Sequence, residues 1–228
     1  MKGLILISAY NCASTIGAVL QDLNILTDLD ILVVNDGSTD NTSKIVKTAG
    51  IQLISHENNL GKGAALQTGF NYAKDKDIDF VLTMDADKQH PAACIADFIR
   101  EHEQHPNDVI LGKRKRDKNM PMTRKLSNSI SALLISWRIG QKIYDAQCGF
   151  RLIPKKYLSW DFSNIKGFIY ESEVLITLAL NHVNFRFIPI PTIYPETGET
   201  KMTYFYSTFG FIFMYISSFF KSYKKRNK

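Results

Sequence analysis

The sequence predicts an α/β fold in which a mostly parallel central sheet is flanked by helices. Short apolar runs alternate with helix-like stretches through the first half of the 228-residue chain. These runs are continuous rather than alternating with polar residues, which is typical of strands buried on both faces. Regular alternation of strands and helices predicts a parallel sheet, and such sheets bind ligands beyond the carboxyl ends of their strands.

The apolar and helical patterns place each element. Strands are expected at residues 4–8, 31–35, 52–55, 80–84 and 109–111. Helices are expected between them, at residues 15–26, 42–49, 64–73 and 92–103. The second half is less regular, and there we expect helices at about 123–137 and 170–180 and a strand at 186–190. We assign residues 1–200 to one domain and residues 201–228 to an aromatic helix with a basic tail.

The C-terminal segment is rich in aromatic residues. Residues 203–220 carry no charge, and the basic run KSYKKRNK follows them. A bilayer span takes about 20 apolar residues, and the serines, threonines and tyrosines here weaken that interpretation. We therefore expect an amphipathic helix on the membrane surface, held by its cationic tail. Packing on the domain, packing in a homodimer and a true membrane span remain alternatives.

Composition narrows the classes of partner. The net charge of +6 and the pI of about 9.1 are compatible with nucleic acid, anionic membranes or phosphorylated substrates. The basic runs lack regularly interleaved aromatics, and no helix-turn-helix or zinc pattern is present, so we expect no nucleic-acid binding. Three widely spaced cysteines suggest no disulfide framework and indicate a reducing compartment.

Polar residues gather where the predicted strands end. Tyr10 and Asn11 follow the first strand, Asp36 follows the second, and Asp85 and Asp87 follow the fourth. The carboxyl ends of parallel strands meet at one edge of the sheet, so these side chains are expected to lie there together.

The two acids after the fourth strand suggest a metal site. In an extended segment, Asp85 and Asp87 point to the same side, so both carboxylates can approach one point. Two acids that close disfavour each other's ionisation unless a cation lies between them. Mg²⁺ and Mn²⁺ take oxygen ligands, often one or two carboxylates plus substrate phosphates. The alternative is a turn and helix cap before Pro91, where Asp is common.

Two further loops contribute candidate ligand-binding residues. An acid at the position of Asp36 can accept hydrogen bonds from a nucleoside, although a capped strand-to-helix turn would also place an acid there. Lys62 lies in a glycine-containing loop before a predicted helix and is expected among the ligand-binding residues. The loop lacks the spacing of a phosphate-binding P-loop.

Five motifs occur in a specific order: SAYN, NDGSTDNT, NLGKGAALQTGF, MDADKQHP and DAQCGFR. This order and spacing resemble family 2 glycosyltransferases with the Rossmann-like GT-A fold, most closely the polyprenyl-phosphate mannose and glucose synthases. The resemblance covers residues 4–193. It implies an inverting transfer of a sugar from a UDP- or GDP-sugar to a polyprenyl phosphate or related lipid, with Mg²⁺ or Mn²⁺ as cofactor.

The resemblance also implies roles in donor binding. Asp36 would hold the nucleoside, and Tyr10 and Asn11 would line the side of its base and ribose. Asp85 would contact the ribose or sugar, and Asp87 would bind the metal.

The residues after Asp87 are assigned in the same way. Gln89 matches a position near the sugar and the metal. Lys88 stands where the family usually has glycine, so this chain departs from the family pattern within the loop itself.

Other residues match the acceptor side of the polyprenyl-phosphate enzymes. Arg114, Arg124 and Lys201 match positions that reach phosphate, and guanidinium groups bind phosphate in a bidentate manner. Arg151 would lie near the floor of the active site, or form a structural ion pair. Glu173 matches the general base of inverting members, but acids in a first helical turn also stabilise the helix dipole.

Two other functions remain open. The first is an enzyme of the same fold that transfers the sugar to a hydroxyl of a polysaccharide or glycolipid. The second, more distant, is a non-catalytic protein that binds a sugar nucleotide. For a lipid-phosphate acceptor, we expect a cytoplasmic enzyme that is peripheral at the inner face of the membrane and works in the cell envelope.

Overall fold

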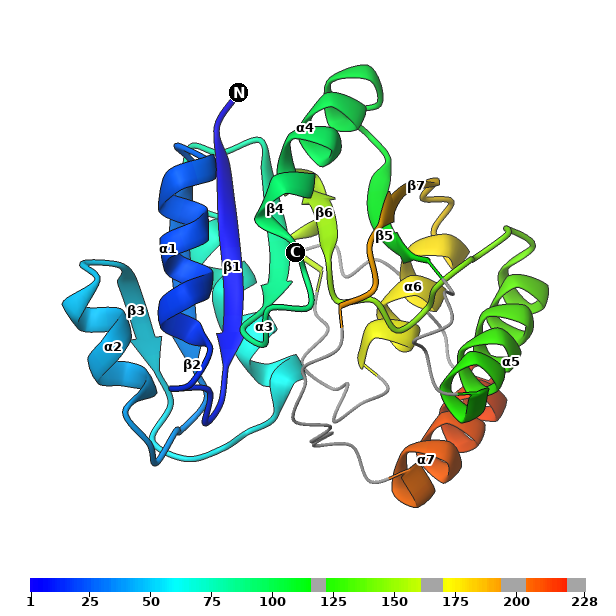
Figure 1. Ribbon diagram of the computed structural model, residues 1–228. Coiled ribbons are helices and arrows are strands. Elements are labelled where there is room, and N and C mark those ends of the chain that lie inside the picture. The colour runs from blue at the N-terminus through cyan, green and yellow to red at the C-terminus, as the bar shows by residue number, and fades with distance from the viewer. Residues whose placement is uncertain (116–121, 161–169, 194–203, 221–228) are drawn as a thin grey trace.

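The computed structural model describes residues 1–115, 122–160, 170–193 and 204–220. Within these residues, seven strands form one sheet in the order β3-β2-β1-β4-β6-β5-β7 (Figure 1). Every strand pair is parallel except the two that involve β6. The predicted α/β fold with a mostly parallel sheet is therefore confirmed.

The strands agree closely with the prediction. All five strands expected in the first half are present, as is the expected strand near residue 186. The sequence did not predict β6, a four-residue strand that joins the sheet antiparallel between β4 and β5. The strands are β1 (Gly3–Ala9), β2 (Asp30–Asn35), β3 (Gln52–Ser55), β4 (Phe80–Asp85), β5 (Val109–Arg114), β6 (Arg151–Pro154) and β7 (Phe185–Ile190).

The helices also lie where they were expected, with two corrections at their starts. The third helix begins at Lys62 rather than at residue 64, so Lys62 opens a helix and does not lie in the loop before it. A short 3₁₀ turn, Ala92–Cys94, precedes the fourth helix. The α-helices are α1 (Ile16–Leu26), α2 (Thr42–Thr48), α3 (Lys62–Ala73), α4 (Ile95–Gln104), α5 (Met122–Ile139), α6 (Tyr170–Leu180) and α7 (Tyr204–Ser217).

Helices cover both faces of the sheet. Leu4 and Leu6 of β1 pack in one core cluster with residues of α3, α5 and α6. Ile5 and Ile7 of the same strand pack in the other cluster, with residues of α1, α2 and α4. Successive strand residues point to opposite faces, so a continuous apolar run is what a sheet covered on both faces requires.

The C-terminal segment forms the predicted helix, and it packs on the domain. Met214 of α7 is buried in the first core cluster, and Arg138 of α5 donates hydrogen bonds to the carbonyl and hydroxyl oxygens of Ser218. No helix in the described part of the chain has the length and hydropathy that a membrane span requires. The predicted domain boundary at residues 200 and 201 lies outside the described residues.

Candidate active site

The loops after β1 and β2 are joined at the carboxyl edge of the sheet. The backbone N–H of Asn11 donates to Ser38 Oγ at 2.9 Å, and the N–H of Thr39 donates to Asn11 Oδ1 at 2.8 Å. Asn11 adopts a φ of +46°, a left-handed conformation that asparagine tolerates better than most residues. Its neighbour Tyr10 is exposed. The predicted nucleoside-side residues therefore lie on adjoining loops.

Asp36 is buried and holds the chain between β3 and α3. Its carboxylate accepts hydrogen bonds from the N–H groups of Leu60 and Gly61, at 2.9 and 2.7 Å, and contacts His56 Nδ1 at 2.7 Å. His56 in turn contacts Thr68 Oγ1 of α3 at 2.9 Å. These contacts give Asp36 a structural role at the carboxyl edge of the sheet, and its contact with a nucleoside stays a prediction.

Lys62 joins two acids from distant elements. Its ammonium lies 2.6 Å from Asp85 Oδ1, at the end of β4, and 2.6 Å from Glu171 Oε1, in the first turn of α6. Burial alone would lower the pKa of Lys62, but the two carboxylates outweigh it and raise that pKa. A Cβ placed on Gly149 would lie only 2.9 Å from Lys62 Nζ, so the loop before β6 closes directly over this ion pair.

Asp85 is held as a carboxylate. Burial would raise its pKa, but the charge of Lys62, with a smaller contribution from Arg114, prevails and lowers it to about 2. The backbone N–H of Asp85 donates to His90 Nδ1 at 3.0 Å, so in neutral His90 the proton lies on Nε2, 3.8 Å from Asp85 Oδ2. The His90 ring stacks on Phe150 with 5.1 Å between centroids, which fixes its orientation.

Asp87 lies beyond the strand, in a turn. Because β4 ends at Asp85, the alternation of an extended strand does not extend to Asp87, and the expectation from that alternation is wrong for this pair. Asp87 Oδ1 accepts a hydrogen bond from the N–H of Gln89 at 3.0 Å, and Lys88 between them has a φ of +65°. Desolvation and the negative charge of Asp85 raise the pKa of Asp87, although its side chain reaches solvent.

The carboxylate ligands at this edge fit a divalent cation that is shared with a diphosphate. Asp85 and Asp87 supply hard oxygen ligands, and the raised pKa of Asp87 means that a nearby cation would stabilise its charged form. In the described residues, no three His, Cys, Asp or Glu side chains are placed to hold a metal ion by themselves. Mg²⁺ commonly binds one or two carboxylates and completes its shell with water and substrate phosphates.

The structure describes the side chain of only one of the three predicted phosphate-binding residues. Arg114, at the carboxyl end of β5, forms a bidentate ion pair with Asp145 at 2.7 and 3.0 Å, and its charge contributes to the low pKa of Asp85. Arg124 lies in α5, but the structure does not describe its side chain. Lys201 lies outside the described residues.

Arg151 is buried at the predicted floor of the site, but its hydrogen bonds go to the backbone. It donates to the carbonyl oxygens of Cys148, Glu171 and Ala146 at 2.8, 2.8 and 3.0 Å. These bonds tie the loop before β6 to the start of α6. The geometry favours this positioning role over both alternatives from the sequence, contact with substrate and a side-chain ion pair.

Four residues at this edge were not predicted from the sequence. Glu171, rather than the predicted Glu173, reaches Lys62; Glu173 is buried in the same helical turn. His56, His90 and Asp145 are the partners of Asp36, Asp85 and Arg114. His90 lies within the acidic motif itself and could have been noticed, whereas the other three pairs depend on the tertiary fold.

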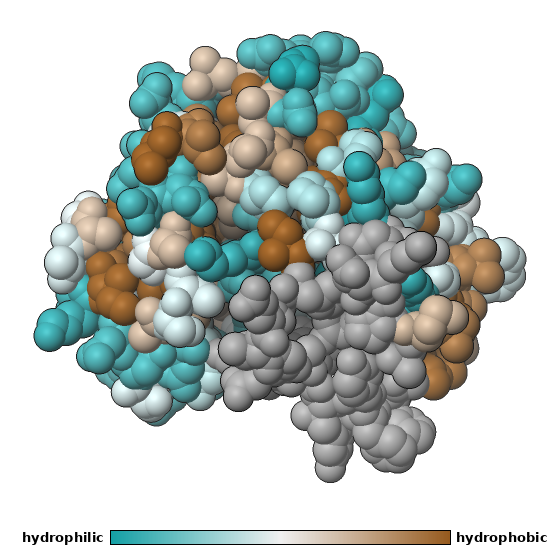
Figure 2. All heavy atoms as spheres, in the orientation of Figure 1, coloured by the Kyte–Doolittle hydropathy of each residue, from teal (hydrophilic) through white to brown (hydrophobic). Residues whose placement is uncertain are grey.

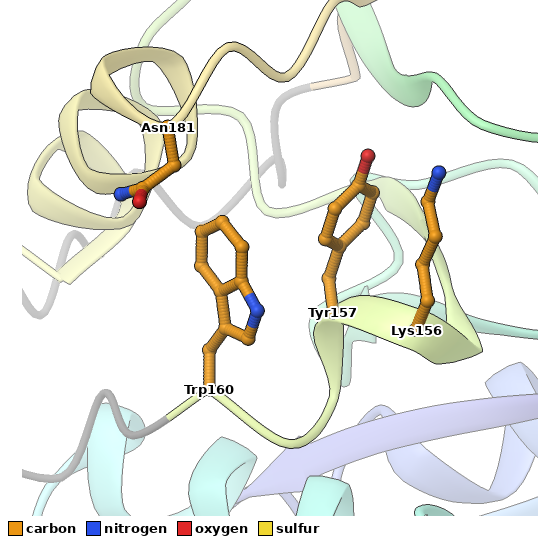
Figure 3. Close-up of a pocket in the computed structure, with 4 residues that line it drawn as sticks. All are labelled: Lys156, Tyr157, Trp160 and Asn181. Carbon is orange, nitrogen blue, oxygen red and sulfur yellow. The ribbon is translucent and has the colours of Figure 1, made fainter. Parts of the chain in front are cut away.

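A separate cavity lies away from these residues. It has a volume of about 280 Å³ and is lined by Lys156, Tyr157, Trp160 and Asn181 (Figure 3). Lys156 and Tyr157 follow β6, whose last residue pairs with the first residue of β4, so this cavity lies at the opposite edge of the sheet. It contains none of the predicted site residues.

Comparisons with known proteins identify relatives over most of the chain. The sequence model of glycosyl transferase family 2 matches residues 4–160. A UDP-N-acetylglucosamine–dolichyl-phosphate N-acetylglucosaminyltransferase of Methanococcus voltae is 32% identical over 222 residues, covering 87% of this chain and 88% of the relative. A dolichyl-phosphate hexose transferase of Haloferax volcanii is 30% identical over 203 residues, covering 87% and 85%.

Solved structures confirm the fold. Glucosyl-3-phosphoglycerate synthase from Mycobacterium tuberculosis, in complex with UDP, superposes with a TM-score of 0.73 at 18% identity, over 95% of this chain and 79% of that one. The same enzyme with Mn²⁺, UDP and glucosyl-3-phosphoglycerate gives a TM-score of 0.71 at 16% identity, over 96% and 78%. At these identities the likeness concerns the fold alone.

Proposed function

This chain belongs to glycosyl transferase family 2, and from that premise we propose that it transfers a sugar from a nucleoside-diphosphate sugar to a polyprenyl phosphate or related lipid phosphate. Two relatives are named for transfer to dolichyl phosphate. The observation that carries the proposal is the convergence of Asp85, Asp87 and Lys62 at the carboxyl edge of the sheet. Carboxylates for a metal and an ammonium for phosphate suit a diphosphate ligand.

The donor would bind across this edge. The loops of Tyr10 and Asn11 would take the nucleoside, as the resemblance to the family implies, and the diphosphate would lie near Asp85, Asp87 and Lys62. A divalent cation held by Asp85 and Asp87, either Mg²⁺ or Mn²⁺, would neutralise charge on the diphosphate leaving group. Structural neighbours bind UDP together with Mn²⁺ or Mg²⁺, which supports this choice of cofactor.

Lys62 would change partners when the donor binds. In the structure its charge is balanced by Asp85 and Glu171. With Asp85 engaged as a metal ligand, Lys62 would exchange that carboxylate for a donor phosphate oxygen, while Glu171 keeps the ammonium near the site. The lysine would thus favour departure of the nucleoside diphosphate by stabilising its negative charge.

The transfer step needs little help with protons. An oxygen of the lipid phosphate would attack the anomeric carbon from the face opposite the leaving group. The bond between that carbon and the donor phosphate oxygen would break, its electron pair would leave with the nucleoside diphosphate, and the anomeric configuration would invert. A phosphate monoester is already anionic near neutral pH, so no base has to deprotonate it.

A hydroxyl acceptor is the second candidate, because Glu171 and Glu173 place two acids at the start of α6. A hydroxyl must lose its proton during attack, and a carboxylate is a suitable base. For a lipid-phosphate acceptor, we expect Glu173→Gln to retain most of the transfer rate. A loss of about 100-fold or more, with a normal donor KM, would favour the hydroxyl acceptor.

The assay that tests the proposal follows radiolabelled sugar into lipid. Purified protein is incubated with Mn²⁺, undecaprenyl phosphate and a panel of UDP- and GDP-sugars. We expect an organic-soluble product with at least one donor, no product with excess chelator, and none with Asp87→Asn. Absence of both product and sugar-nucleotide hydrolysis across the panel would contradict the proposal.

A lipid acceptor places the enzyme at a membrane. We propose that it acts in the cytoplasm, peripherally at the inner face of the membrane, where soluble sugar nucleotides and the phosphate group of a polyprenyl lipid meet.

A further inference from the structure

The outward face of α5 is apolar. Met122, Leu126, Ile130, Leu133 and Trp137 recur every three or four residues, which places them on one side of the helix. All are exposed, with Leu133 at 69% and Trp137 at 72%. The opposite side of α5 packs on the domain through Ile135 and Ala132. A helix on the surface of a water-soluble domain normally presents polar residues outward.

The helix α7 extends this apolar surface. Ile212, Phe213 and Ile216 are exposed, as are Phe219 and Phe220 just beyond the helix. The rings of Trp137 and Phe219 lie 6.0 Å apart, which joins the two sets of side chains. Figure 1 shows the two helices side by side at one end of the molecule, and Figure 2 shows hydrophobic side chains along the flank where α5 lies. We call this surface the α5–α7 face.

The two stretches of sequence that contain α5 and α7 are basic. In the sequence, residues 118–144 contain five Lys and Arg, residues 200–228 contain six, and neither stretch contains an acid. The rest of the chain holds the other 17 Lys and Arg against all 22 Asp and Glu. The excess of basic residues therefore comes from the two stretches that include α5 and α7.

We propose that the α5–α7 face is a docking surface for an anionic phospholipid bilayer, in which α5 inserts as well as the C-terminal helix. Apolar side chains would enter the boundary between headgroups and acyl chains, while the surrounding Lys and Arg contact anionic headgroups. This inference rests on the proposed function, because it names the surface through which a lipid acceptor is approached.

The position of α5 explains how docking would serve transfer. Arg114 ends β5 at the carboxyl edge of the sheet, and the chain from Arg114 to Met122 joins that edge to α5. Only seven residues of the chain separate Arg114, at that edge, from Met122, the first residue of the docked helix. A lipid phosphate could then reach the site while its chain remains in the bilayer.

The chain contains a natural reporter for this surface. It has two tryptophans, Trp137 in the α5–α7 face and Trp160, which is 7% exposed. We expect vesicles of phosphatidylcholine and phosphatidylglycerol with brominated acyl chains to quench Trp137 and to shift its emission to shorter wavelength. The shift and most of the quenching should disappear in Trp137→Phe, and vesicles of phosphatidylcholine alone should have a much smaller effect.

Paired variants separate this face from general surface hydrophobicity. Leu133→Glu/Trp137→Glu should reduce the fraction that floats with these vesicles by about tenfold or more, because membrane binding scales with apolar area. The matched control Ile25→Glu/Leu26→Glu changes two exposed apolar residues on α1 and should float like wild type. Circular dichroism and thermal denaturation without vesicles report whether each variant is folded.

The outcomes distinguish the possible partners of the face. Flotation without quenching of Trp137 would mean that α5 does not insert, and would overturn the proposal. So would a wild-type dimer that does not float and that Leu133→Glu/Trp137→Glu converts to a monomer, because the face would then bind a second copy of the chain. The flotation assay contains neither donor nor acceptor, so its result is independent of whether transfer occurs.

Discussion

Lys88 shows how a single residue carries a conformational demand of the active site. It lies between Asp87 and Gln89 with a φ of +65°, in the turn that follows β4 and in which Asp87 accepts a hydrogen bond from the N–H of Gln89. The left-handed region costs a non-glycine residue about 1–2 kcal/mol. The glycine that the family usually has at this position would avoid that cost, so the departure in this chain leaves strain in the turn.

Lys88→Gly should therefore stabilise the protein. Relief of the left-handed strain outweighs the extra freedom of glycine in the unfolded chain, and we expect the free energy of unfolding to rise by about 0.5–1 kcal/mol. Urea denaturation measures this change. The control Lys74→Gly replaces an exposed lysine whose φ is −56°, and it should destabilise instead. Equal destabilisation by both variants would show that the turn does not strain Lys88.

The other residue-scale prediction concerns Lys62. If this lysine moves to the donor diphosphate, Lys62→Met should raise the donor KM by about 10–100-fold, the value of a charge-assisted hydrogen bond. The measurement is the steady-state rate of transfer against donor concentration at saturating Mn²⁺. Lys74→Met, at the other end of α3, is the control and should behave as wild type. An unchanged donor KM for Lys62→Met would confine the lysine to the structural ion pair.

At the scale of elements, Arg151 links the loop before β6 to α6. Its three hydrogen bonds fix the backbone of both segments, and Gly149 in that loop lies against Lys62 and Asp85. The acids of α6 are thereby held opposite the end of β4. This arrangement explains how Glu171, about 86 residues after Asp85 in the chain, comes to share a lysine with it.

Arg151→Met should act mainly on stability. It removes three hydrogen bonds from a buried position, and we expect the free energy of unfolding to fall by about 3 kcal/mol or more. Thermal or chemical denaturation measures the loss. A variant with wild-type stability and no transfer activity would instead assign Arg151 to the chemical step.

The pattern of apolar residues in the sequence was sufficient to predict most strands and helices, but not the contacts between them. Continuous apolar runs predicted five of the strands, and the residues that follow them predicted the edge at which Asp36, Asp85 and Asp87 lie. The four residues of β6 are too few to give a periodic signal. The roles of Glu171 and Arg151 depend on α6 packing against the loop before β6, and local sequence contains no trace of that pairing.

At the scale of the whole molecule, the proposals assign separate tasks to two surfaces. The carboxyl edge of the sheet gathers the acids and Lys62 that suit a nucleoside-diphosphate sugar, and the α5–α7 face carries the apolar side chains and basic neighbours that suit a bilayer. The connection from β5 to α5 joins them. This layout is consistent with a water-soluble donor and a lipid acceptor that meet at one edge.

The central claim is that Asp87 and Asp85 bind a divalent cation together with the donor diphosphate. Isothermal titration of UDP and of GDP into the protein, with Mn²⁺ or with chelator, tests it most directly. For at least one nucleotide, we expect binding that weakens about tenfold or more both with chelator and, in the presence of Mn²⁺, in Asp87→Asn. Equal affinity in all of these conditions would contradict the claim, as would the absence of binding to either nucleotide.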